Sequence, residues 1–109
     1  MPNLQRDQHY NSIYNLGNRI LHNKKTVTAA GTAVLLIGAT QETLIVTIKA
    51  LHTNTNMIYV GDFDVDSNNG YVLDAGEEVT LIVDNAQDNI YIDSDTNGEG
   101  VTYIAWYAA

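Results

Sequence analysis

The stretch IYVGDFDVDSNNGYVLDAGEEVTLIV, residues 58–83, decides the fold. It opens with a β-branched and aromatic run at residues 58–60. An acidic loop follows at residues 62–70, and a second turn at residues 74–76 precedes alternating residues at 78–83. Strong β-formers bounded by Gly, Asn and Asp are typical of antiparallel strands joined by tight connections. The stretch therefore predicts two strands separated by an acidic loop.

The same pattern recurs on both sides of this stretch and predicts an all-β chain. Turn residues such as Ala29-Ala30-Gly31 and the hairpin pair Asn97-Gly98 separate short apolar runs. Strands are expected at residues 26–28, 33–37, 44–51, 58–60, 79–83, 89–93 and 101–107. Short strands punctuated in this way indicate an antiparallel β-sandwich of about seven strands. We assign it to residues 26–109, with residues 1–25 as an N-terminal arm.

Length and composition limit the remaining possibilities. A chain of 109 residues fits one domain and is long enough to bury a core. Cysteine is absent, which excludes disulfides, thiolate metal sites and cysteine nucleophiles. No apolar run approaches the roughly 20 residues of a membrane span, and the polar N-terminal residues lack a signal-peptide core. We expect a soluble, non-secreted protein, or one released by lysis, that has no membrane partner.

Charge is distributed unevenly along the chain. Residues 1–25 carry four basic residues and one acidic residue, a net charge of +3, whereas the remainder carries one basic and twelve acidic residues, a net charge of −11. This asymmetry indicates a basic arm on an acidic body. An acidic body repels phosphates, so we expect no nucleic-acid partner. The alternative is that the acidity of the body only maintains solubility.

The arm has apolar residues at three- and four-residue steps, which would place them on one helical face. These residues are Tyr10, Ile13, Tyr14, Gly17, Ile20 and Leu21. Gly17 and four asparagines are poor helix formers, and a helix this short is marginal alone. Three interpretations stay open: a frayed tail, an arm that orders on a partner or another subunit, or a helix packed on its own sandwich.

Two acidic segments resemble parts of calcium loops. Residues 93–98 match the first half of such a loop, D-x-D-x-N-G, but its twelfth position is Ile104 instead of a bidentate Glu. Asp62, Asp64 and Asp66 alternate similarly, without Gly at the sixth position. A divalent ion is an alternative at each place. We interpret both as solvated turns and expect no metal or other cofactor.

Signals for catalysis are weak. His9, His22 and His52 lack zinc-site spacing, and no G-x-S-x-G, P-loop or dinucleotide fingerprint occurs. We therefore predict that the protein is not an enzyme. Seven tyrosines and one tryptophan keep carbohydrate binding open as an alternative. Those within expected strands, such as Tyr91 and Trp106, are also explained by cross-strand packing.

The segment VTIKALHTNTNMIYVG, residues 46–61, carries a resemblance together with Ser67-Asn68-Asn69-Gly70, Ala75-Gly76-Glu77 and the ending 90–106. The chain resembles small β-sandwich proteins encoded among the structural genes of tailed bacteriophages, over about residues 26–106. This resemblance implies a virion component, often a head decoration (cement) protein or a module of fibres and tails. It supplies no catalytic residue, and the arm lies outside it.

The expectation is therefore a decoration protein on the capsid surface, which stabilises contacts between major capsid subunits through its arm. The expected partners are the major capsid protein and further copies of the chain, as a trimer or dimer. The apolar anchors would be Tyr10, Ile13, Tyr14, Ile20 and Leu21, and the basic contacts Arg6, Arg19, Lys24 and Lys25. The rival is a fibre or tail module that binds a host glycan or receptor through residues 62–70 and exposed tyrosines.

Overall fold

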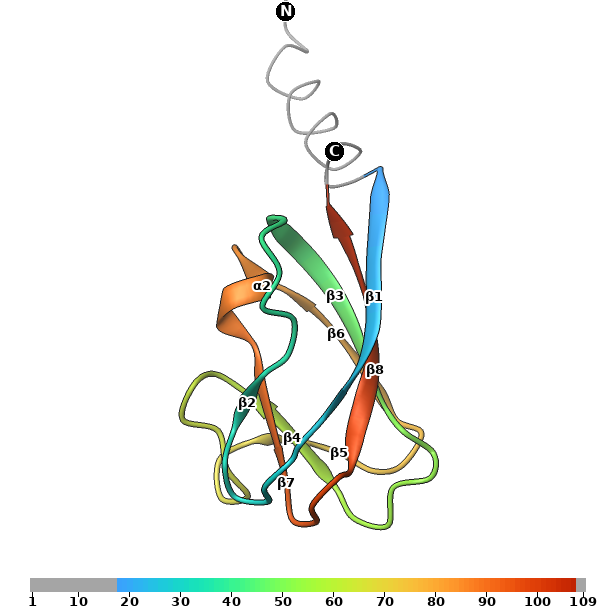
Figure 1. Cartoon of the computed structure of the whole chain (residues 1–109), viewed down its shortest axis with the longest axis vertical. Helices are drawn as coiled ribbons and strands as arrows, with labels where there is room; N and C mark the ends of the chain where they lie inside the picture. The colour runs from blue at the N-terminus through green and yellow to red at the C-terminus, as the bar shows by residue number, and fades with distance from the viewer. Residues whose placement is uncertain (1–17, 108–109) are drawn as a thin grey trace, which may run out of the picture.

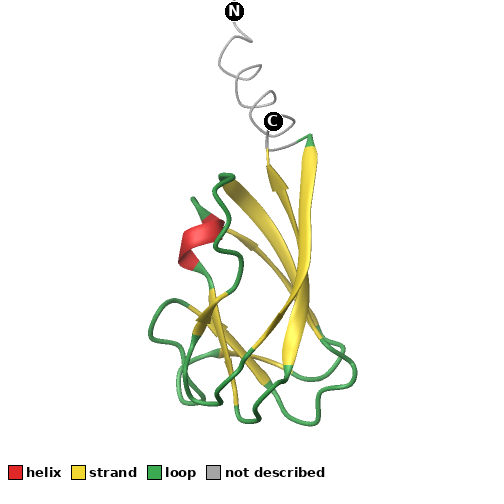
Figure 2. Cartoon of the chain, viewed as in Figure 1, coloured by secondary structure: helices red, strands yellow, loops and turns green. Residues whose placement is uncertain are grey.

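Two antiparallel sheets of four strands each pack face to face in the computed structural model, which describes residues 18–107 (Figure 1; Figure 2). Sheet A has the order β1 (Arg19–Thr26), β8 (Gly100–Tyr107), β3 (Thr43–Ala50), β6 (Glu78–Ile82). Sheet B has the order β2 (Val34–Leu35), β7 (Tyr91–Ser94), β4 (Ile58–Gly61), β5 (Tyr71–Leu73). A single helical turn, α2 (Ala86–Asn89), connects β6 to β7.

The pairing of the strands defines a jelly roll. β1 pairs with β8, β2 with β7, β3 with β6 and β4 with β5, all antiparallel. The chain is thus one long hairpin folded over on itself. The β3–β8 and β4–β7 pairings then join these four pairs into two sheets. Eight strands in this order form a double-sheet jelly roll. The predicted all-β sandwich is confirmed. β1 and β5 are strands that the sequence did not predict, and the strand expected at residues 26–28 is wrong, because only Thr26, the last residue of β1, is extended there.

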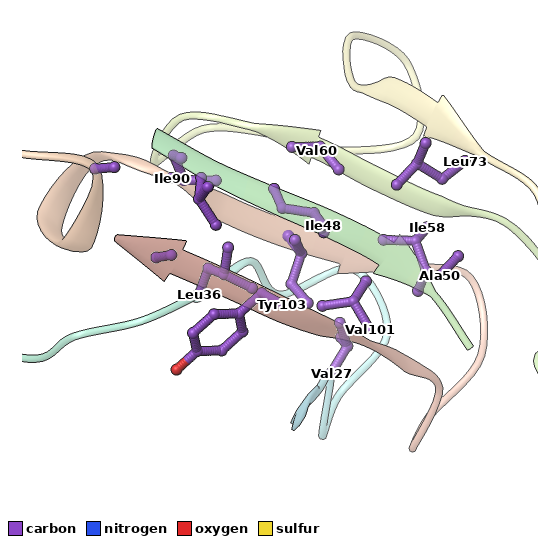
Figure 3. Packing of buried hydrophobic residues seen from close by; sticks show 14 residues of the cluster. Val27, Leu36, Ile48, Ala50, Ile58, Val60, Leu73, Ile90, Val101 and Tyr103 are labelled. Atoms are coloured by element: carbon purple, nitrogen blue, oxygen red, sulfur yellow. The ribbon is translucent and has the colours of Figure 1, made fainter. Parts of the chain in front are cut away.

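Strict alternation along the strands builds the core between the sheets. On β3, Val46, Ile48 and Ala50 are fully buried, and they lie opposite inward residues of β8 such as Ala105 and Tyr103. Sheet B contributes Ile58, Val60 and Leu73, which are labelled in Figure 3, and also Ile92. Burying one such Val, Leu or Ile side chain stabilises the fold by about 1.5–3 kcal/mol. This central core fixes the relative position of the two sheets.

The boundary predicted at residue 25 is wrong, because residues 19–25 belong to sheet A. β1 pairs with β8 over its whole length, from Arg19 opposite Tyr107 to Thr26 opposite Gly100. Ile20 and Leu21 are neighbours on a strand, so they point to opposite faces instead of sharing a helical face. This segment was not predicted as a strand because its composition is polar. An edge strand can be polar, since many of its side chains stay in solvent. Arg6, Tyr10, Ile13 and Tyr14 lie outside the described residues.

Smaller differences concern short elements. β5 has three residues and follows the acidic loop directly, so it offered too little alternation to be recognised. The strand expected at residues 33–37 is only two residues long, Val34–Leu35. The turn expected at residues 85–88 forms α2, which Asn85 introduces in the left-handed region at φ 52°. Asn tolerates this conformation better than most residues.

Candidate functional site

An apolar row crosses the outer face of sheet A. The registers place Ile20 opposite Trp106, Trp106 opposite Ile45, and Ile45 opposite Ile82. We call these four residues the outer row. Ile20 is 53% exposed and Ile82 is 71% exposed, at the two edges of the sheet. Trp106 and Ile45 are half-buried between them. One side chain from every strand of sheet A therefore contributes to a continuous apolar surface.

The outer row lies at the end of sheet A where the described chain begins. Asn18, which precedes β1, donates its backbone N–H to the carbonyl of Tyr107 at 3.1 Å. The described chain consequently enters sheet A at Asn18, next to Ile20 and Trp106. Toward the other end of the sheet, the outer face becomes polar. Thr47 and Thr80 share a hydrogen bond between their hydroxyl oxygens at 2.8 Å, and the next row contains Lys24, Thr102, Lys49 and Glu78.

A groove of about 690 Å³ opens between the sheets on the side of β5 and β6. Its lining includes Val79 and Leu81 of β6, with Val83 directly after that strand. Val60 of β4, Tyr71 of β5 and Phe63 in the loop between them complete the apolar lining on the other side. The mouth is aromatic and accessible, because Phe63 is 73% exposed and Tyr71 is 60% exposed. Asp62 and Asn89 supply its polar groups. A mainly apolar groove with a few polar groups is the usual form of a ligand site.

The acidic loop between β4 and β5 is held by its own turns. Asp66 accepts a hydrogen bond from the backbone N–H of Asn68 at 2.8 Å, and Asn69 accepts one from the N–H of Asp66 at 2.8 Å. Val65 is buried beneath the loop. Asp62 and Asp64 interact at the surface: their mutual side-chain hydrogen bond lowers the pKa of Asp62 and raises that of Asp64. Two adjacent carboxyls titrate in this way because both resist being charged together.

The second acidic segment, residues 93–98, also uses its oxygen atoms internally. Asp93 is buried and accepts hydrogen bonds from the N–H groups of Gly31 at 3.0 Å and Ser94 at 2.8 Å. Asp95 accepts one from the Tyr59 hydroxyl at 2.6 Å. That hydrogen bond, together with burial, raises the pKa of Tyr59 to about 12. These carboxylates fasten the β7–β8 turn to its neighbours.

Glu99 connects this turn to the loop between β3 and β4. Its carboxylate accepts hydrogen bonds from the backbone N–H and hydroxyl of Thr55 and, at 2.9 Å, from the N–H of Asn56. The hydrogen bond from the Thr55 N–H is the main reason that the pKa of Glu99 is lowered. Asn54 adds a reciprocal pair with the backbone of Gly100, at 2.9 and 3.2 Å. The end of the sandwich opposite the outer row is thus extensively hydrogen-bonded.

The strand β1 divides the anchors that the sequence predicted. Ile20 and Lys24 point to the outer face of sheet A. Leu21 points to the inner face and packs against the core. Arg19 and Lys25 point to the same inner face as Leu21, at the edge of the sheet. Sequence reasoning missed Trp106, Ile45 and Ile82 as partners of Ile20, because they are brought together only by strand register. The sequence did contain one signal for this surface: each of the four strands has an apolar residue at a position that faces solvent.

Within residues 18–107 no group of three or more His, Asp or Glu side chains is placed to hold a metal ion. The same residues contain no helix of the length and apolarity needed to cross a membrane. A scan against protein-family models and searches of curated proteins and solved structures found no significant match to this chain.

Proposed function

We propose that this protein is a virion structural protein, a capsid decoration protein that binds the outside of the head and stabilises contacts between major capsid subunits. The resemblance of residues 26–106 to phage β-sandwich proteins supports this function. The jelly-roll architecture agrees with it, since viral capsid and lectin domains use this fold, although a fold alone does not define a function. The acidic body argues against DNA as the bound surface.

The outer row is the observation that carries the proposal. Exposed apolar surface that is contiguous and bordered by polar residues marks a site of protein association. Ile20, Trp106, Ile45 and Ile82 form such a surface. The next row contains His22, Ile104, Thr47 and Thr80, and the row after it, with Lys24, Thr102, Lys49 and Glu78, is polar. A tryptophan near the centre of a contact is a common energetic hot spot. The outer face of sheet A would therefore rest on the capsid.

The first seventeen residues would supply a second contact with the same surface. They enter the sheet beside the outer row, at Asn18. An extended segment of this length spans up to roughly 55 Å, enough to reach a neighbouring subunit. Tyr10, Ile13 and Tyr14 would be its apolar anchors and Arg6 its basic contact. Two weak contacts on one lattice reinforce each other, because the second forms at high effective concentration.

Substitution of the central residue of the row tests the proposal. Trp106→Ser should lower binding to heads purified without this protein by at least about tenfold, as expected for a buried hot-spot residue. Binding is measured by co-sedimentation, with circular dichroism to confirm the fold. Thr102→Ser, on the same strand and face but in the polar row, is the matched control and should bind normally. Full occupancy of heads by the Trp106 variant would refute the proposed contact face.

The role of the N-terminal segment is tested in the full chain. Replacing Tyr10, Ile13 and Tyr14 together by Ser should leave the sandwich folded and reduce the occupancy of heads. Deletion of residues 1–22 is unsuitable as a test because it removes half of β1. If the triple variant decorates heads as fully as the original protein, the segment is not an anchor.

The groove favours a second candidate function, a fibre or tail module that recognises a host glycan. Phe63 and Tyr71 present exposed aromatic rings beside Asp62 and Asn89. Aromatic faces next to carboxylate and amide groups suit a sugar ring. Binding on a glycan array that is lost in Phe63→Ala and Tyr71→Ala, together with few copies per particle located on the tail, would favour this function over decoration.

A further inference from the structure

Within residues 18–107, β6 pairs only with β3, and its backbone groups at three alternate positions point away from that strand. Ala50 donates its N–H to the carbonyl of Glu77 at 2.9 Å, and Val83 donates to that of Leu44 at 2.8 Å. Because backbone groups alternate in direction along a strand, residues 77, 79, 81 and 83 bond to β3. The N–H and C=O groups of Glu78, Thr80 and Ile82 therefore point outward from the sheet.

The opposite edge of sheet A, on β1, has the complementary set. Val27 donates its N–H to the carbonyl of Glu99 at 2.8 Å, in register with the β1–β8 pairing. The odd-numbered residues of β1 accordingly bond to β8. The backbone groups of Ile20, His22 and Lys24 point away from the sheet. β1 and β6 run in opposite directions, because each step across sheet A is antiparallel.

These two edges match when a second copy continues the sheet. Its β1 would lie antiparallel to β6, and extension of the existing rows sets the register. Ile82 then faces Ile20 of the second copy, Thr80 faces His22, and Glu78 faces Lys24. These are the residues whose backbone groups point away from the sheet on both edges. The N–H of Lys24 donates to Asn23 Oδ1 at 2.8 Å and would exchange this hydrogen bond for one to Glu78. Each facing pair can therefore exchange two hydrogen bonds, as in an ordinary antiparallel ladder.

The side chains agree with this register at both ends of the outer face and at two pairs of the inner face. On the outer face, two exposed isoleucines meet at one end and Glu78 meets Lys24 at the other. On the inner face, Leu81 meets Leu21 of the second copy at the groove and Glu77 meets Lys25, whereas Val79 meets Asn23 and Val83 meets Arg19. The segment 77–82 has two acids and no base, whereas residues 19–25 have three bases and no acid. Opposite charges and apolar pairs across strands each stabilise a sheet.

Pairing of like edges is less favourable. Two β6 strands related by a two-fold axis at Thr80 would place Glu78 against Ile82, and two β1 strands centred on His22 would place Lys24 against Ile20. We propose that copies of this chain associate head to tail, the β6 edge of one with the β1 edge of the next. Such a heterologous contact does not close as a dimer and gives a ring of three or more copies, or a filament.

This association does not depend on the proposed function, since it is a property of the purified chain. It leaves the outer face of sheet A uncovered. The outer row of each copy would continue into that of the next, with Ile82 beside Ile20 at every junction. A ring would consequently present one uninterrupted apolar band.

Disulfide trapping tests the register in the full-length chain, which has no cysteine of its own. His22→Cys and Thr80→Cys are combined in one chain. Facing residues of a hydrogen-bonded pair lie about 5.5 Å apart between Cα atoms, within the range of a disulfide. Within one copy the two positions are three strand spacings apart, about 14 Å, too far to bridge. Oxidation should yield covalent trimers or a ladder of larger species that reductant reverses.

Two controls give this experiment its specificity. Met57→Cys combined with Thr80→Cys should stay monomeric, because Met57 is exposed in the loop immediately before β4 of the other sheet. Thr80→Cys alone should also stay monomeric. Efficient disulfide dimers of Thr80→Cys alone would show a two-fold β6–β6 contact and overturn the proposal.

Charge exchange tests the same contact without cross-links. Glu78→Lys and Lys24→Glu should each weaken association by at least about tenfold in sedimentation equilibrium, because like charges then face each other. The double variant carries both changes at every contact and should recover most of the affinity. Glu42→Lys, an exposed charge change on neither edge, is the control and should associate normally.

A chain that stays monomeric at millimolar concentration overturns the proposal. The same holds if a monomer shows slow hydrogen exchange at the amides of Thr80 and Ile82, because another segment, such as residues 1–17, would then occupy the β6 edge. Failure of the double variant to recover association would also refute the register.

Discussion

β1 and β6 form the two edges of the same sheet, yet they differ in length, in charge and in how far their side chains discourage pairing with other strands. β1 has eight residues and carries Arg19, Lys24 and Lys25, and cationic side chains discourage pairing of an edge with unrelated strands. β6 has five residues, no Lys or Pro, and ends at the exposed Ile82. The comparison shows that an edge can be closed to general partners and still be complementary to one particular edge.

The surroundings of the two edges differ as well. β1 ends beside the hydrogen-bonded turn that contains Glu99 and Gly100, so its last residues are fixed. β6 borders the apolar groove, and its inward residues Val79, Leu81 and Val83 are only partly buried. Apolar side chains at a groove lack part of the packing that a closed core provides. The β6 side is therefore the less complete part of the sandwich.

The largest expected effect comes from disrupting the attachment of β1. An added Cβ at Gly100 would lie 2.1 Å from the carbonyl oxygen of Lys25, which is backbone and cannot rotate away. Gly100→Ala should lower the free energy of unfolding by about 3 kcal/mol, at the upper end of overpacking effects. Urea denaturation measures this value, and Thr102→Ala on the same strand is the control. An unchanged midpoint would show that β1 is not held closely against β8.

A matched pair of truncations compares the two edges directly. Leu21 on β1 and Leu81 on β6 are both partly buried against the core. Leu21→Ala and Leu81→Ala should each cost about 1–2 kcal/mol in dilute solution, below the cost of a fully buried leucine because less surface is lost. Denaturant melts at low protein concentration provide the values. A much larger loss for Leu81→Ala would indicate that the groove is already filled in the isolated chain.

The smallest expected effect concerns the hydrogen-bonded end and depends on pH. The pKa of Glu99 lies below its ordinary value of 4.5, mainly because the Thr55 N–H donates to its carboxylate. A carboxyl with a lowered folded-state pKa contributes stability above its unfolded pKa, and this contribution is lost as pH falls through the folded value. Glu99→Gln should lower the free energy of unfolding at pH 7. It should also make that free energy fall less steeply as the pH is lowered below about 4.5.

Thermal melts between pH 3 and 7 measure this dependence. Thr55→Ala removes the hydroxyl donor and keeps the backbone donor, so it should change the pH dependence less than Glu99→Gln does. Equal pH profiles for the original protein and the Glu99 variant would show that this carboxylate does not anchor the turn.

The strands that carry the core could be predicted because their alternation is local. Residues 44–51 and 101–107 show buried and exposed positions in regular succession, and the structure places β3 and β8 there within a residue or two. β1 could not be predicted in the same way. Its Asn, His and Lys residues have low strand preference, and only pairing with β8 stabilises the extended backbone. β5 was too short for a pattern to be detected.

The sequence by itself determined the fold class, because β-formers alternate with turn residues at intervals suited to strands. The acids of residues 93–98, interpreted from the sequence as solvated, are instead hydrogen-bonded within the fold, and Asp93 is buried. Tertiary structure alone decided the outer row, the groove and the match between the two edges of sheet A. Their residues are distant in the chain, and strand register, which depends on the burial of the opposite face, sets which of them become neighbours.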